Sequence, residues 1–111
     1  AALASETGAT ATKADSAVRD EVVKAVADAG ALDVVVINAG VAMMGDPLEL
    51  DAAAVERLFD INIRAPYFAA VEAGRRMNDN GRIIIIGSVN GDRAGWPGVT
   101  AYAVSKSAMQ G

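Results

Sequence analysis

A tyrosine and a lysine four positions apart, Tyr102 and Lys106, are the side chains of this sequence best suited to proton transfer. On a helix they would lie on one face, about 5–6 Å apart at Cβ. A lysine ammonium beside a phenol favours the phenolate and lowers a phenol pKa that is ordinarily about 10. Such a tyrosine exchanges protons with a substrate near neutral pH. The same spacing also describes an ordinary pair on a helix surface, so the function needs support from other residues.

A hydroxyl group, that of Ser88, precedes this pair and directly follows the apolar run 82–86 and a glycine. It reaches the tyrosine only if the intervening loop folds back, and the loop contains residues that favour turns. These are Gly91, Gly95, Pro97 and Gly98. Other loop residues either line a substrate pocket or only pack the loops, namely Met43, Met44, Trp96 and Val99.

The composition excludes several other chemistries. The 111 residues contain no cysteine and no histidine, so they supply no disulfide, no cysteine-based zinc site and no Ser-His-Asp triad. We therefore expect no metal site, and proton transfer must fall to Tyr, Lys, Asp or Glu. A formal net charge of −4 argues against nucleic-acid binding. No apolar run reaches the ~18 residues that cross a membrane, and we expect a cytoplasmic protein.

The apolar pattern predicts strands alternating with helices. Runs of branched apolar residues predict strands at 32–37 and 82–86, each buried on both faces, and a weaker pattern suggests a short strand at 9–14. Helical spacing predicts helices over residues 1–7, 17–29 and 52–77 and around Tyr102. Asn80 and Gly81 predict a turn. This order predicts βαβ units, and hence an α/β fold with helices on both faces of a parallel sheet.

Asn62 occupies a core position on the longest predicted helix, where a buried amide needs hydrogen-bond partners. Pro66, four residues later, has no N–H for the Asn62 carbonyl and crowds that carbonyl. The pair therefore predicts a kink that leaves the carbonyl available to a water or another group. A simple proline kink capped by Asn62 is the alternative.

Polar residues and glycines follow the predicted strands at their carboxyl ends. In open α/β sheets ligands bind beyond these ends, so a nucleotide could lie along this edge. The Asn-Ala-Gly sequence also fits a plain turn, while a glycine permits close approach to a ligand. The residues at strand ends are Asp15, Ser16, Asn38, Ala39, Gly40 and Ser88.

With these motifs in this order, the chain resembles the central part of a short-chain dehydrogenase/reductase. The resemblance covers essentially all residues and implies a Rossmann-like, doubly wound parallel sheet with three αβα layers, present here as an internal fragment. Residues 1–111 would be part of one NAD(P)-binding domain. The resemblance rests on Asp15, Asn38-Ala39-Gly40, Asn62, Ser88 and Tyr102-x-x-x-Lys106.

The resemblance implies a role for each of these residues. Tyr102 would be the catalytic acid or base, while Lys106 would lower its pKa and hold the nicotinamide ribose. Ser88 would orient the substrate oxygen. Asn62 would hold a water of a proton relay through its main-chain carbonyl. The cofactor cleft would be lined by Asn38, Ala39 and Gly40, with Asp15 and the adjacent Ser16 near the adenine.

The resemblance implies two functions. The first is hydride transfer between a nicotinamide cofactor, NADP in preference to NAD, and a carbonyl or alcohol substrate. The second follows from residues 58–67 and 83–93, which are most similar to a family member that binds cyclic-di-GMP in biofilm dispersal. That alternative is a cyclic-di-GMP-binding regulator with little or no catalysis. By family habit the full-length protein would be a homodimer or homotetramer, with helix 52–77 as a candidate interface.

The family's glycine-rich phosphate loop, Thr-Gly-x-x-x-Gly-x-Gly, does not occur in these 111 residues, and neither does the strand end that selects NAD or NADP. Because the chain begins at Ala1 and its last predicted helix reaches Gly111, we expect a piece of a longer protein. We expect this piece to be inactive alone and to leave the strand at 9–14 without neighbours.

Overall fold

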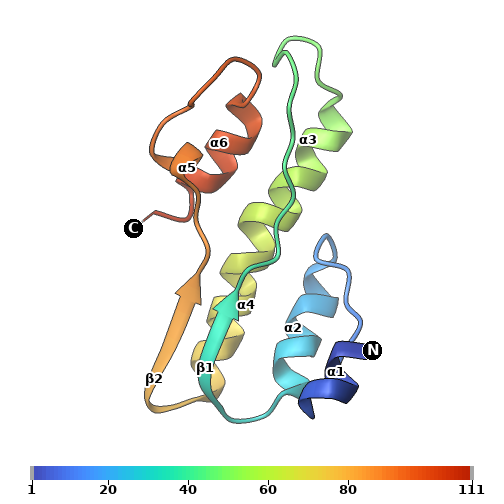
Figure 1. Cartoon of the computed structure of the whole chain (residues 1–111), viewed down its shortest axis with the longest axis vertical. Coiled ribbons are helices and arrows are strands. Elements are labelled where there is room, and N and C mark those ends of the chain that lie inside the picture. Colours follow the sequence, from blue (N-terminus) through green and yellow to red (C-terminus); the bar gives the residue numbers. More distant parts are fainter. Residues whose placement is uncertain (1, 111) are drawn as a thin grey trace.

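The centre of the fold is a sheet of two parallel strands, β1 (Leu32–Ile37) and β2 (Met77–Ile85). The computed structural model describes residues 2–110 (Figure 1). A long helical run connects the strands and packs along the sheet, as parallel pairing requires. This run consists of α3 (Ala52–Phe59), the π-helical turn η1 (Asp60–Arg64) and α4 (Ala65–Arg76). The predicted α/β pattern with parallel strands is confirmed.

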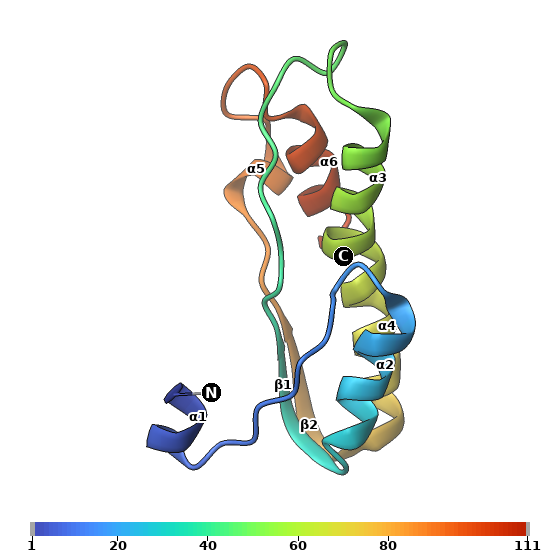
Figure 2. The ribbon, with the colours of Figure 1, turned by 90° about the vertical axis from the view of Figure 1, so that its right-hand side faces the viewer.

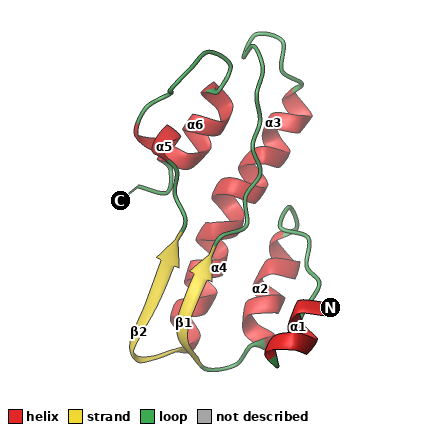
Figure 3. Ribbon diagram, viewed as in Figure 1, coloured by secondary structure: helices red, strands yellow, loops and turns green. Residues whose placement is uncertain are grey.

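The remaining helices flank this unit (Figure 3). They are α1 (Ala2–Thr7), α2 (Arg19–Asp28), α5 (Val89–Asp92) and α6 (Thr100–Ser107). Figure 2 shows α2, α3, α4 and α6 on one side of the strands, with α1 on the other. Among residues 2–110, no helix combines the length and the apolar character that crossing a membrane requires.

The sheet exposes apolar side chains on the face that these helices leave open. Val34 and Val36 on β1 are 57% and 56% exposed, and Ile84, the partner of Val36, is 46% exposed. Val35 and Ile37 point to the opposite face and line a cavity with α2 and α4. The prediction that both strands are buried on both faces is therefore wrong, because only the short α1 lies on the second side within the described residues.

The predicted strand at 9–14 is also wrong, because these residues form no strand. A strand requires the backbone of a neighbour for its hydrogen bonds, and the expected neighbours are not part of these 111 residues. The following helix begins at Arg19 rather than at residue 17. The Asp15 carboxylate accepts a hydrogen bond from the Ala17 backbone N–H at 2.8 Å, which keeps these residues in a turn.

The predicted turn at Asn80 and Gly81 lies inside β2, because the strand begins at Met77 rather than at residue 82. Pairing moves from Leu32 with Met77 to Val34 with Arg82, so β2 carries a bulge opposite β1. Asn80 has a φ of 64°. A Cβ at Gly81 would lie 2.2 Å from Met77 Sδ, so a side chain here would displace the Met77 side chain.

The apolar core is small and rich in alanine. The Cα radius of gyration is 15.5 Å, whereas a compact domain of this length has about 13 Å. Little apolar surface is therefore removed from water, and the open sheet face adds to what remains exposed. The buried apolar residues are Leu58, Ile61, Ala65, Ala69, Ala73, Val99 and Ala103.

We expect the isolated 111-residue chain to unfold without a cooperative transition, because this core does not offset the conformational entropy of the chain. The measurement is differential scanning calorimetry together with circular dichroism. A cooperative domain of about 100 residues absorbs roughly 60–80 kcal/mol on unfolding. A heat-absorption peak of that size, coincident with loss of helical signal, would contradict the expectation.

Glu72 is a buried carboxylate on α4, held by two arginines of the same helix. It accepts hydrogen bonds from Arg75 at 2.8 Å and from Arg76 at 2.9 Å. These bonds, that of Arg75 first, hold the Glu72 pKa below its ordinary value of 4.5. Because the folded state favours the charged form, the pair stabilises the fold above that ordinary pKa. The stabilisation is lost as the pH falls through the lowered pKa.

We therefore expect Glu72→Gln to lower the free energy of unfolding of the full-length protein at pH 7. The difference from wild type should shrink as the pH falls well below the ordinary carboxyl pKa, where both side chains are neutral. Urea unfolding at several pH values measures this. Asp20→Asn, which changes an exposed carboxylate on α2, serves as the control. A Glu72→Gln difference that is the same at all pH values would refute the assignment.

Candidate functional site

The buried centre of the site is the side-chain amide of Asn62, on η1. It is 1% exposed. Its Oδ1 accepts a hydrogen bond from the Val41 N–H at 2.9 Å, and its Nδ2 donates to the Val41 carbonyl at 2.8 Å. Nδ2 also donates to Ser105 Oγ at 3.0 Å. The predicted need for partners is confirmed, and the amide holds the segment after β1 against both η1 and α6.

The helix is disturbed where the Asn62–Pro66 pair predicts it, and the disturbance is a π-helical turn. The Ala65 N–H donates to the Asp60 carbonyl, five residues earlier. Pro66, which has no N–H, then stands at the start of α4. A π-helical turn changes the direction of the side chains it carries. The availability of the Asn62 main-chain carbonyl stays a prediction.

Lys106 and Tyr102 lie one turn apart on α6, as their spacing predicts. The lysine is 7% exposed, and its Nζ donates to the Ile86 carbonyl at 3.2 Å. The same Nζ lies 6.0 Å from the centroid of the half-buried Tyr102 ring. An ammonium has three N–H donors. With one hydrogen bond to residues 2–110, Lys106 retains donors for a hydroxyl-bearing ligand beside Tyr102.

Gly40 lies between the lysine and the asparagine. A Cβ at this position would stand 3.3 Å from Lys106 Nζ and 3.4 Å from Asn62 Oδ1. The first distance is slightly tighter than ordinary van der Waals contact, so a side chain here would press on the Lys106 ammonium and touch the Asn62 amide. The glycine therefore allows the segment after β1 to approach the two buried polar side chains.

Ser88 stands two residues after Ile86, the residue whose carbonyl binds Lys106. Its Oγ accepts a hydrogen bond from the Asn90 N–H at 3.2 Å and caps the short helix α5. Within the described residues, no hydrogen bond joins Ser88 to Tyr102. The loop after α5 contacts the segment that follows β1, where the Gly45 N–H donates to the Gly98 carbonyl at 2.9 Å. Gly98 has a φ of +83°, a conformation that favours glycine.

The other predicted cofactor-binding residues lie on the side of this cluster that faces α2. Ser16, Asn38 and Ala39 line a cavity of about 180 Å³ between α2, β1 and α4. Asp15 is exposed, and its carboxylate lies 3.6 Å from Arg57 on α3. The structure thus brings Gly40, Asn62, Tyr102 and Lys106 together, whereas Asp15, Ser16, Asn38 and Ala39 lie toward α2.

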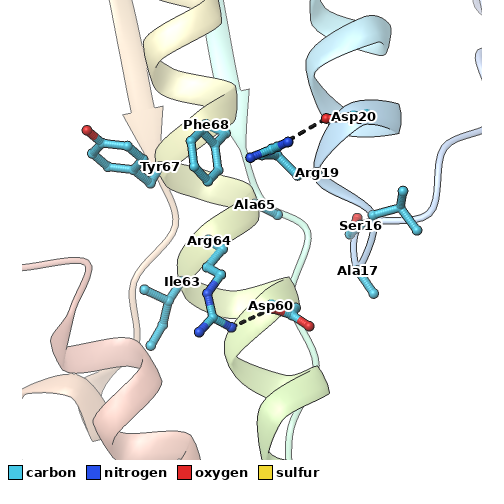
Figure 4. A pocket seen from close by; sticks show the side chains of 11 residues that line it. Ser16, Ala17, Arg19, Asp20, Asp60, Ile63, Arg64, Ala65, Tyr67 and Phe68 are labelled. Carbon is cyan, nitrogen blue, oxygen red and sulfur yellow. Dashed lines mark hydrogen bonds and ion pairs between the residues drawn. The ribbon is translucent and has the colours of Figure 1, made fainter.

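Another groove in the described part of the chain lies between α2 and the helical run η1–α4. Its volume is about 780 Å³, and Figure 4 shows Arg19 beside Phe68 at this groove. The Arg19 guanidinium is 5.5 Å from the Phe68 ring centroid and pairs with Asp20 at 3.0 Å, while Arg64 pairs with Asp60. Its lining includes Ser16, a predicted cofactor-binding residue, but none of the predicted catalytic residues, and its guanidinium groups already have carboxylate partners.

One residue of the buried network was missed by the sequence argument. Ser105 is 0% exposed, accepts the hydrogen bond from Asn62 and donates to the Tyr102 carbonyl at 2.7 Å. Its position three residues after Tyr102 places it on the same helix face, which is the signal that could have found it. Its partner Asn62 is 43 residues away in sequence, and no local pattern reports that contact.

Comparison with known proteins gives a consistent result. The family model for short chain dehydrogenases matches residues 1–111. A relative named cyclic-di-GMP-binding biofilm dispersal mediator protein, from Escherichia coli K12, is 60% identical over 109 residues, covering 98% of this chain and 46% of the relative. Elsinochrome reductase 1 from Elsinoe fawcettii is 38% identical over 86 residues, covering 78% of this chain and 32% of the relative.

A solved structure agrees with these sequence matches. The crystal structure of BdcA in complex with NADPH matches with a TM-score of 0.94 and 59% identity, over 98% of this chain and 45% of that one. This similarity confirms the Rossmann-like fold, of which the present residues are a part. The chain spans less than half the length of these relatives. From its sequence, its fold and its Tyr102–Lys106 helix, this chain belongs to the short-chain dehydrogenase family.

Proposed function

We propose that the protein containing these residues is an NADPH-dependent oxidoreductase that reduces a carbonyl to an alcohol, or runs the reverse reaction. The observation that carries this proposal is the buried Lys106 ammonium, fixed on the Ile86 carbonyl and facing the Tyr102 ring. Family membership and the NADPH bound to a similar protein support it. Residues 1–111 would belong to one NAD(P)-binding domain.

The residues of the cluster fit the ribose end of a nicotinamide nucleotide. Lys106 presents ammonium donors in a buried position, which suits hydroxyl acceptors of a ribose. Gly40 lacks a side chain and leaves that ammonium unobstructed. The glycine-rich loop that would bind the phosphates is not among these 111 residues. We therefore expect the chain alone to be inactive and the full-length protein to hold the cofactor.

Tyr102, Lys106 and Ser88 would then each have a role in carbonyl reduction. When bound, the nicotinamide cofactor would supply the hydride that reduction of the carbonyl carbon requires. Tyr102 donates its phenolic proton to the carbonyl oxygen, so that an alcohol results. Lys106 stabilises the phenolate that remains. Ser88, three residues after β2, would donate its hydroxyl proton to the substrate oxygen while its Oγ accepts from the Asn90 N–H.

We expect Tyr102→Phe to lower kcat/KM of the full-length protein by about 10²- to 10⁴-fold, because the variant cannot supply the proton. The measurement is NADPH consumption with a panel of ketones and aldehydes. Tyr67→Phe is the matched control, since Tyr67 is a 63% exposed tyrosine on α4. Absence of turnover for every carbonyl, or equal rates for wild type and Tyr102→Phe, would refute the proposed activity.

A second candidate function is binding of cyclic-di-GMP. The observation that favours it is the 60% identity to a relative whose name states that it binds this nucleotide. The hydrogen-bond donors at a sheet edge that binds one dinucleotide, NADPH, would also suit another, cyclic-di-GMP. Binding and hydride transfer do not exclude each other.

We expect the full-length protein to bind cyclic-di-GMP with a micromolar Kd in isothermal titration calorimetry. Tyr102→Phe should bind with unchanged affinity, because a phenolic proton donor is not required for nucleotide binding. Titration of NADPH into the same samples provides the positive control. No heat of binding for cyclic-di-GMP at micromolar concentrations, in a sample that binds NADPH, would remove this candidate.

A further inference from the structure

The hydroxyl of Ser105 lies at the junction of two residues already assigned to the site. It is completely buried. It accepts a hydrogen bond from Asn62 Nδ2 at 3.0 Å and donates one to the main-chain carbonyl of Tyr102 at 2.7 Å. The hydroxyl is therefore used once as acceptor and once as donor. It joins η1 to the turn of α6 that carries the tyrosine.

Two consecutive residues of α6, Ser105 and Lys106, connect this helix to the segments that follow both strands. Ser105 contacts Asn62, which holds the Val41 backbone beyond β1 through two hydrogen bonds. Lys106 contacts the Ile86 carbonyl beyond β2. These hydrogen bonds to the segments after two adjacent strands fix both the axial position of α6 and its rotation about its own axis. The direction of the Tyr102 ring depends on that rotation.

Ser107 is a second serine of α6, and its hydroxyl contacts α5 instead of η1. Its hydroxyl contacts the Gly91 carbonyl at 2.7 Å and the Ala103 carbonyl at 2.9 Å, so it joins α6 to α5. It has the same chemistry as Ser105 and stands two residues away. Because it does not contact Asn62, it provides a matched control for the loss of a helix hydroxyl.

We propose that Ser105 is a positioning residue for catalysis, which acts through Asn62 and the Tyr102 backbone to direct the proton-donating phenol. The proposal rests on the proposed oxidoreductase function. Without the hydroxyl, the buried Nδ2–H of Asn62 loses an acceptor, and the amide must turn to find another. That movement releases the Val41 backbone and lets α6 rotate, so Tyr102 leaves the direction that proton transfer requires.

The test compares Ser105→Ala, Ser105→Thr and Ser107→Ala in the full-length protein, with NADPH and a ketone or aldehyde. We expect Ser105→Ala to lower kcat by about 10- to 100-fold, the scale of a misplaced catalytic group, with little change in KM. Ser105→Thr retains the hydroxyl and should recover most of the lost kcat. Ser107→Ala should keep the wild-type kcat.

A double-mutant cycle with Asn62→Ala tests the route of the effect. If Ser105 acts through Asn62, the double variant should lose little more kcat than the more severe single variant. If the fold-losses in kcat of the two single variants multiply in the double variant, the two residues act independently. That result would overturn the proposal that Ser105 acts through Asn62. A wild-type kcat in Ser105→Ala, in a protein that Tyr102→Phe inactivates, would overturn the inference while leaving the proposed function intact.

If the wild-type protein reduces no carbonyl, crystal structures of the variants test whether Ser105 positions Tyr102. The structure of Ser105→Ala should show the Val41 backbone and the Tyr102 ring displaced, with both restored in Ser105→Thr. Unmoved Val41 and Tyr102 positions in Ser105→Ala would refute the positioning role. Failure of the oxidoreductase function and failure of this inference are thus separate outcomes.

Discussion

The arrangement of this site depends on one requirement, that a buried amide must find hydrogen-bond partners. Asn62 meets it with the two backbone groups of Val41 and the hydroxyl of Ser105. These partners come from segments separated by 21 and 43 residues from Asn62. Because leaving such groups unpaired costs about 1–3 kcal/mol, the requirement brings the end of β1, the helical run and α6 together in one place.

The parallel sheet provides the second part of the arrangement. Adjacent parallel strands end on the same edge, so the segments after β1 and β2 emerge side by side. Gly40 and Val41 follow one strand, and Ile86 and Ser88 follow the other. Helix α6 then lies across both through Ser105 and Lys106. A tyrosine on that helix is held by contacts with both strand ends rather than by its own helix alone.

The polar cluster contrasts with the weakness of the apolar core around it. Most of the buried apolar residues are alanines, and one face of the sheet is open to water. Yet Asn62, Ser105 and Lys106 are buried and hydrogen-bonded. The order of the site therefore comes from directional hydrogen bonds, which specify geometry, while the apolar contacts that supply most folding free energy are fewer than a domain of this length normally has.

The sequence alone determined the features that depend on spacing along the chain. It determined the parallel α/β pattern, the Tyr102–Lys106 pair on one helix face and the helix disturbance beside Pro66, because periodicity and proline chemistry are local properties. Only the tertiary structure decided which polar groups meet. It showed Ser105 as the partner of Asn62, the bulge in β2 and the exposed sheet face, and it gave residues 9–14 no strand. Pairing and burial depend on neighbours distant in sequence, and no local pattern encodes those neighbours.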